Sequence, residues 1–280
     1  MERKNAIISG GAGFIGGHLS LRLLKEGFNK VYIIDNLVRT NSLRNISEDD
    51  KIEFIYGDVC NFDFTVLNDI THFFHLAATR INRCATYNKE GHDYIASGGF
   101  NVVNYCAKNN IKLFFSSTAS VYNKPKRQPI QENDPCTPHT IYGAGKYYTE
   151  NLIRSYNNMV GLDYTINRFF IKVFGNPDEK ILDLVYVNDV IDAIILSTFN
   201  SNKEVFNVST QNGVTLTELI NTIEDVTNTK LNIEIVPENR TDIENKRVGD
   251  TTKLKKLGWN PKYNLRDGIL NTNRWIKYKL

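Results

Sequence analysis

Cysteines are few in this sequence of 280 residues, and their spacing excludes several kinds of site. The four cysteines are Cys60, Cys84, Cys106 and Cys136, and no two of them form a C-x-x-C pair. Neither a zinc site nor a disulfide framework is therefore indicated, and the five scattered histidines predict no metal site either. Unpaired thiols are typical of a reducing compartment, so we expect the protein to be cytoplasmic.

Long apolar runs are also lacking. No segment reaches the roughly 20 apolar residues that cross a membrane, and residues 1–5 lead into the first predicted strand without the apolar core of a signal peptide. The net charge is only +3, and the basic residues are spread along the chain rather than clustered. We therefore expect neither a membrane nor a nucleic acid as a partner, and 41% hydrophobic residues suit a globular core.

What the sequence does contain is a glycine-rich turn between a short apolar strand and a helix. Its glycines are spaced three residues apart: Gly10, Gly13 and Gly16. This spacing lets the backbone approach a pyrophosphate at the helix N-terminus. Asp35 ends a second apolar strand about 20 residues later, where a carboxylate binds the adenosine ribose and repels a 2′-phosphate. NAD is therefore predicted as the cofactor, and Arg39 and Arg44 keep NADP as the alternative.

Strand and helix patterns alternate through the first two thirds of the chain. Among them we expect a helix over His18–Gly27 with Leu21 on its buried side, a helix over much of Tyr94–Asn109 and a strand at Lys112–Thr118, and further along a helix over Thr215–Asn228 with Thr215 as its cap. This alternation predicts an α/β fold with a Rossmann-type doubly wound parallel sheet, whose ligands gather at the carboxyl ends of the strands. We assign residues 1–174 to an NAD-binding domain, to which residues 184–200 return. Residues 175–280 are assigned to a smaller C-terminal α/β domain that binds substrate.

A tyrosine and a lysine, Tyr142 and Lys146, lie four residues apart where a long helix is expected to begin, so their side chains share one face. A free phenol is a poor base at neutral pH, but a nearby ammonium and a positively charged nicotinamide ring favour its phenolate. Thr118 ends the fifth predicted strand, and its hydroxyl can meet the same substrate oxygen. The fourth predicted strand ends in residues that leave room for a cofactor: Leu76, Ala77 and Ala78.

These motifs, in this order, resemble those of the extended short-chain dehydrogenases/reductases, in the group of NAD-dependent nucleotide-sugar epimerases and dehydratases. The matching segments span nearly the whole chain: residues 10–16, 35–37, 57–59, 75–78, 116–122, 142–146, 185–190 and 257–261. The resemblance implies that Tyr142 is the catalytic base, that Lys146 holds the nicotinamide ribose and that Thr118 steers the sugar hydroxyl. It also implies that Asp58 and Val59 contact the adenine. The full set of residues that the resemblance implies as cofactor contacts is Gly10, Gly13, Phe14, Ile15, Gly16, Asp35, Asn36, Asp58, Val59, Leu76, Ala77, Ala78, Ser116, Tyr142 and Lys146.

The substrate side of the resemblance rests on four basic residues. Arg240 resembles the arginine that binds substrate phosphates, with a plain surface charge as the alternative. Lys172 is either a phosphate ligand or a solvated lysine. Arg80 and Arg83 follow the fourth strand near the expected place of the sugar, and the same two readings apply to them.

The chain departs from the resemblance in two places. Dehydratases of the group carry an Asp-Glu pair after the strand-end threonine, whereas this chain has Ala119 and Ser120, so loss of water is not expected. Only residues 176–184 lie between Gly175 and the segment 185–190, where members of the group usually place a helix and a strand. This shortened substrate-binding region predicts a cleft that leaves the nucleotide open to water.

We therefore interpret the sequence as that of an NAD-dependent epimerase of a nucleotide-activated sugar, acting by transient oxidation to a keto-sugar and assembling as a homodimer. A sugar dehydrogenase or keto-sugar reductase would use the same tyrosine and lysine. A non-catalytic dinucleotide-binding protein is the alternative of another class, favoured by the shortened region and opposed by the intact Thr118, Tyr142 and Lys146.

Overall fold

Most of the described strands form one large parallel sheet. The computed structural model describes residues 4–39, 42–122, 125, 127–170, 181–233 and 248–279. Seven strands pair in the order β3-β2-β1-β4-β5-β6-β8. Their bounds are β1 (Asn5–Ser9), β2 (Lys30–Asp35), β3 (Ile52–Tyr56), β4 (Ile70–His75), β5 (Lys112–Thr118), β6 (Tyr164–Phe169) and β8 (Glu204–Val208). Every neighbouring pair is parallel, so all the carboxyl ends meet at one edge.

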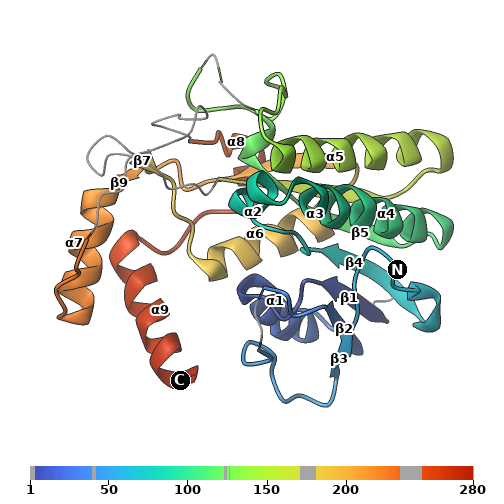
Figure 1. Ribbon diagram of the computed structural model, residues 1–280, viewed down its shortest axis with the longest axis horizontal. Helices are drawn as coiled ribbons and strands as arrows, with labels where there is room; N and C mark the ends of the chain where they lie inside the picture. Colours follow the sequence, from blue (N-terminus) through green and yellow to red (C-terminus); the bar gives the residue numbers. More distant parts are fainter. Residues whose placement is uncertain are drawn as a thin grey trace.

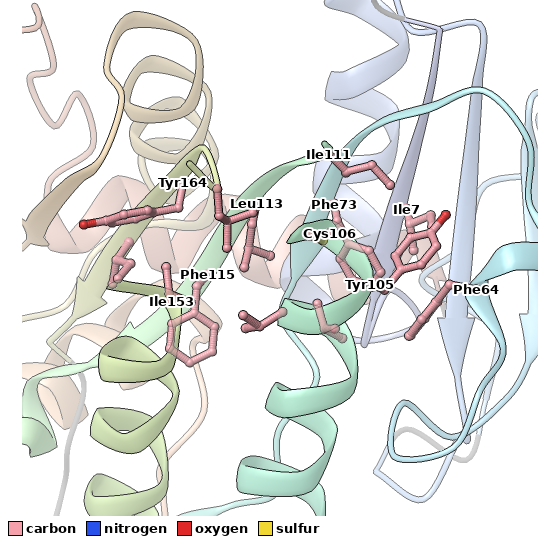
Figure 2. Packing of buried hydrophobic residues seen from close by; sticks show 14 of the residues in the cluster. Ile7, Phe64, Phe73, Tyr105, Cys106, Ile111, Leu113, Phe115, Ile153 and Tyr164 are labelled. Atoms are coloured by element: carbon pink, nitrogen blue, oxygen red, sulfur yellow. The ribbon is translucent and has the colours of Figure 1, made fainter. Parts of the chain in front are cut away.

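Helices cover both faces of this sheet, because side chains of a strand point alternately to opposite sides. Phe73 packs with Val102 of α4, whereas its neighbour Phe74 packs with Ile194 of α6 on the other face (Figure 2 shows the first cluster). The helices are α1 (Phe14–Lys25), α2 (Ile81–Thr86), α3 (Asn88–His92), α4 (Gly98–Lys108), α5 (Ile141–Val160), α6 (Val187–Asn200), α7 (Leu216–Thr227), α8 (Thr252–Lys255) and α9 (Leu265–Lys279). Helices α4 and α5 lie side by side on one face, and α1 and α6 cover the other (Figure 1). This arrangement confirms the predicted doubly wound parallel sheet.

The last third of the chain contains α7 and α9, which pack on each other at one end of the molecule (Figure 1). Helix α7 begins as the sequence predicts, since the Thr215 hydroxyl accepts a hydrogen bond from the backbone N–H of Glu218 and the Glu218 carboxylate accepts one from the backbone N–H of Thr215. A short antiparallel pair, β7 (Ile181–Leu182) with β9 (Val214–Thr215), lies beside this helix. No described helix is both long and apolar enough to span a membrane.

Several local expectations need correction. Residues 205–208, which we assigned to the C-terminal domain, form β8 at the edge of the large sheet because they pair in parallel with β6. The helix expected from Tyr94 is α4 and begins at Gly98, after a turn of π-helix over Asp93–Ser97. Leu21 of α1 is exposed rather than buried. The division at residue 174 itself remains a prediction.

Candidate active site

The glycine-rich turn joins β1 to α1 at the carboxyl edge of the sheet. Gly10 has φ +73°, and a Cβ atom there would lie 2.7 Å from the backbone nitrogen of Ala77, so only glycine fits between the ends of β1 and β4. At Gly16 a Cβ atom would lie 2.5 Å from Cα of Gly11, because the first helical turn folds back onto the loop. These two glycines are therefore required by the packing of the turn itself.

Gly13 is different, because a side chain there would meet few protein atoms. A Cβ atom there would meet only the carbonyl oxygen of Gly10, at 3.1 Å. Gly13 is also the N-cap of α1, and no side chain caps the helix. The first backbone N–H groups of α1 therefore lack a side-chain partner and, together with the positive end of the helix dipole, suit an anionic group such as a pyrophosphate.

The carboxylate of Asp35 ends β2 beside this turn. Its two oxygens accept hydrogen bonds from the backbone N–H groups of Leu37, at 2.8 Å, and Ala12, at 3.2 Å. Burial raises the pKa of Asp35 above its usual value, while these two N–H groups oppose the shift. Asn36 donates to the carboxylate of Asp58 at 2.9 Å, which ties the end of β2 to the loop after β3.

A cavity of about 180 Å³ opens between these strand ends. Of the predicted cofactor residues, the following line it: Gly10, Gly13, Asp35, Asn36, Val59, Leu76, Ala77 and Ala78. Asp58 lies outside its lining and belongs to a neighbouring hollow with Cys60 and Asp93. Arg39, which keeps NADP as the alternative cofactor, also lines the cavity. Further lining residues that the sequence did not indicate as cofactor ligands are Ile34, Val38, Gly57, Thr79 and Tyr94.

The lining residues that the sequence analysis missed differ in whether the sequence carries a signal for them. Thr79 directly follows Ala78, so its strand-end position was a usable signal, and its hydroxyl accepts a hydrogen bond from Arg39 across the cavity. Tyr94 had no comparable signal. It reaches the cavity from the turn of π-helix that precedes α4, and such an irregular turn has no recognisable pattern in the sequence.

Thr118, Tyr142 and Lys146 come together where β5 ends and α5 begins. The Thr140 hydroxyl caps α5 by accepting a hydrogen bond from Gly143 N–H at 3.0 Å, which fixes the start of the helix. Lys146 is 2% exposed, and its ammonium donates to the backbone oxygen of Ser116 at 2.7 Å. The helix thus brings its lysine to the end of the strand that carries Thr118.

Burial controls the protonation of both helix residues. It raises the pKa of Tyr142 to about 12, and an interaction with the Thr118 side chain opposes this shift. The same cause lowers the pKa of Lys146 to about 7. The lowered pKa that we expected for Tyr142 therefore requires a positive charge beside its hydroxyl, such as the nicotinamide ring.

Of the four predicted substrate residues, two lie in the described part of the chain. Arg80 precedes α2 and is exposed, and the guanidinium of Arg83 lies 5.0 Å from the centre of the Tyr87 ring. Helix α2 packs beside α5, so both arginines lie in a segment that borders the tyrosine and lysine (Figure 1). Lys172 and Arg240 lie outside the described residues. In the described part of the chain no group of three or more His, Cys, Asp or Glu side chains could hold a metal ion.

Comparisons with known proteins define the class. The NAD dependent epimerase/dehydratase family matches residues 6–181. A putative UDP-glucose 4-epimerase of Methanocaldococcus jannaschii is 29% identical, covering 97% of this chain and 98% of that protein. UDP-glucuronic acid decarboxylase 3 of Arabidopsis thaliana is 27% identical, covering 94% and 86%. The structure of UDP-glucose 4-epimerase from Thermotoga maritima with UDP-glucose has a TM-score of 0.88 at 25% identity, covering 98% and 99%.

The family match spans more than half of the chain, which therefore belongs to the NAD dependent epimerase/dehydratase family. This confirms the predicted group of extended short-chain dehydrogenases/reductases and the prediction of NAD as the cofactor. The protein is accordingly an NAD-dependent enzyme whose relatives include UDP-sugar epimerases.

Proposed function

We propose that this protein is an NAD-dependent epimerase that inverts C4 of a UDP-activated sugar. The observation that carries the proposal is the convergence of Thr118, Tyr142 and Lys146 at the end of β5, beside a turn and a carboxylate that suit NAD. The names of the relatives support UDP as the nucleotide and C4 as the inverted carbon.

Different residues of the site bind different parts of the cofactor. Gly13 and the uncapped start of α1 bind the pyrophosphate, and Asp35 accepts hydrogen bonds from the adenosine ribose. The loop after β3 and the end of β4 enclose the adenine side through Val59 and Ala77. The ammonium of Lys146 lies within reach of the strand end and binds the nicotinamide ribose.

The protein's own groups supply the proton transfer. When bound, NAD would supply the hydride acceptor for oxidation of the sugar carbon and the hydride donor for its reduction from the opposite face. Burial raises the pKa of the Tyr142 hydroxyl to about 12, and a positively charged nicotinamide ring beside this hydroxyl would lower that pKa. Tyr142 then removes the proton from the sugar hydroxyl and gives it back, while Thr118 donates a hydrogen bond to the same sugar oxygen.

The proposal also includes assembly as a homodimer and a cytoplasmic location. Exposed apolar side chains lie along α4 and α5, among them Phe100, Tyr148 and Met159. A two-fold pairing of these helices would bury them, which supports a homodimer. A cytoplasmic location is supported by the lack of a disulfide bond among the described cysteines.

The test is an incubation of the purified protein with UDP-glucose, UDP-galactose and UDP-glucuronic acid, with products identified by NMR. We expect interconversion of the two hexoses without net formation of reduced nicotinamide. Release of carbon dioxide from UDP-glucuronic acid would favour the decarboxylase named among the relatives. Net reduction of added NAD would favour a dehydrogenase, and no turnover with any sugar would favour a non-catalytic binding protein.

A further inference from the structure

A fully buried carboxylate lies on the same helix face as the proposed catalytic residues. Glu150 is 0% exposed and lies one helical turn after Lys146 and two turns after Tyr142. One of its oxygens accepts hydrogen bonds from Ser117 Oγ at 2.6 Å and from Arg168 Nε at 2.9 Å. The other accepts from Arg168 Nη2 at 2.5 Å and from Arg154 Nη2 at 2.9 Å.

The arginine of this pair extends the connection away from the helix. Arg168 is 2% exposed and holds Glu150 with a bidentate fork, while its Nη1 donates to Tyr122 Oη at 2.7 Å. Tyr122 in turn donates to Asn207 Oδ1, also at 2.7 Å. Arg168 belongs to β6 and Asn207 to β8, so one buried network joins α5 to two strands and to the segment after β5.

The network enters the active site through Ser117. On β5 this serine lies between Ser116, whose backbone oxygen accepts from Lys146, and Thr118. It is also paired in register with Arg168 of β6. The position of α5 relative to the end of β5 is therefore fixed at two points, by Lys146 to Ser116 and by Glu150 to Ser117.

We propose that Glu150 and Arg168 are positioning residues that hold the helix of Tyr142 and Lys146 at a fixed distance from Thr118 on β5. This inference rests on the proposed function, because it assigns the pair to the geometry of the same reaction. A buried ion pair is weak support for a stabilising role, since an apolar pair of similar volume often leaves a fold equally stable. Alignment of the reacting groups, in contrast, tolerates displacements of only a fraction of an ångström.

The experiment separates geometry from stability. The double variant Glu150→Met with Arg168→Met removes the pair without leaving a buried charge unpartnered. Ser117→Ala is a milder change that deletes only the bond between β5 and the carboxylate. For both we expect a folded protein with wild-type affinity for ADP-ribose and an unchanged KM. We expect kcat to fall roughly 10-fold or more for each, with altered fluorescence emission of bound NADH.

The matched control is Arg154→Met. Arg154 bonds the same carboxylate, but its side chain is 32% exposed. Its other partners are Asn151 of the same helix and Tyr164 at the start of β6, the end of the sheet remote from Thr118, so kcat and emission should remain those of the wild type. Folded variants at Glu150, Arg168 and Ser117 that retain wild-type kcat and NADH emission would overturn the positioning role. If the wild type itself converts no UDP-sugar, the proposed function fails. The NADH emission of the variants then tests by itself whether Glu150 and Arg168 position the helix of Tyr142 and Lys146.

Discussion

Replacement of Gly13 by alanine should weaken cofactor binding strongly while leaving the fold intact. Gly13 has φ −69°, a conformation that alanine adopts without strain, and the added Cβ atom would meet only the Gly10 carbonyl oxygen at 3.1 Å. That oxygen needs to move by a few tenths of an ångström. Because alanine also restricts the unfolded chain by about 0.4 to 1 kcal/mol, the melting temperature should change little.

The cost to the cofactor is larger. Because Gly13 is the N-cap of α1, the new methyl group would lie beside the backbone N–H groups to which we assign the pyrophosphate. Loss of a hydrogen bond to a charged group costs about 1.5 to 3 kcal/mol, and loss of the helix-terminus interaction costs up to about 2 kcal/mol. A combined loss of about 3 to 4 kcal/mol corresponds to a Kd for NAD that is roughly 100- to 1000-fold weaker.

The matched variant is Gly16→Ala, three residues further along the same motif. There the Cβ atom would lie 2.5 Å from Cα of Gly11 and 2.8 Å from two backbone oxygens, so the backbone itself has to move. We expect a loss of about 1 to 3 kcal/mol in the free energy of unfolding. Calorimetric titration with NAD and thermal unfolding without cofactor measure the two effects. Wild-type affinity of the Gly13 variant would refute the placement of the pyrophosphate.

Four further predictions follow from the same structure. NAD should bind more tightly than NADP by about 2 kcal/mol, and Asp35→Ala should erase this difference in calorimetry; equal affinities in the wild type would instead point to Arg39 as a phosphate ligand. Tyr142→Phe should keep the fold and NAD affinity while turnover falls roughly 10²-fold or more, and near-normal turnover would mean that another residue is the base. Burial and the charge of Lys146 lower the pKa of His75 to about 3. Between that value and the usual pKa near 6.5 only the unfolded state binds this proton, so stability should fall with decreasing pH by up to about 1.4 kcal/mol per unit, and His75→Asn should show a correspondingly smaller slope in denaturant titrations. The shortened segment 176–184 predicts a weaker affinity for UDP-glucose than for NAD, and submicromolar binding of free UDP would contradict it.

Much of the cofactor side could be predicted from the sequence because its signals are local. The glycines, the carboxylate at the end of β2 and the threonine cap of α7 each depend on a few consecutive residues with defined backbone needs. Strand β5 coincides with its predicted bounds, Lys112–Thr118, since an apolar run between polar residues marks a buried strand.

What escaped prediction depends on residues that are distant in sequence. The placement of β8 beside β6 is decided by pairing at the sheet edge, which an isolated strand pattern cannot reveal. Glu150 and Arg168 are charged residues of a helix and a strand, and their burial as an ion pair depends on how the fold packs these two elements. Tyr94 reaches the cofactor cavity through an irregular turn. Lys172 and Arg240 remain predictions for the substrate side.

The central claim is that hydride leaves and returns to the same sugar carbon within one active site. The direct test uses UDP-glucose that carries deuterium at the carbon inverted by the related 4-epimerases. We predict that the UDP-galactose product retains all of this deuterium and takes up no hydrogen from the solvent at that carbon. Loss of the label to water, or solvent hydrogen at the inverted carbon, would contradict transient oxidation and the role assigned to NAD.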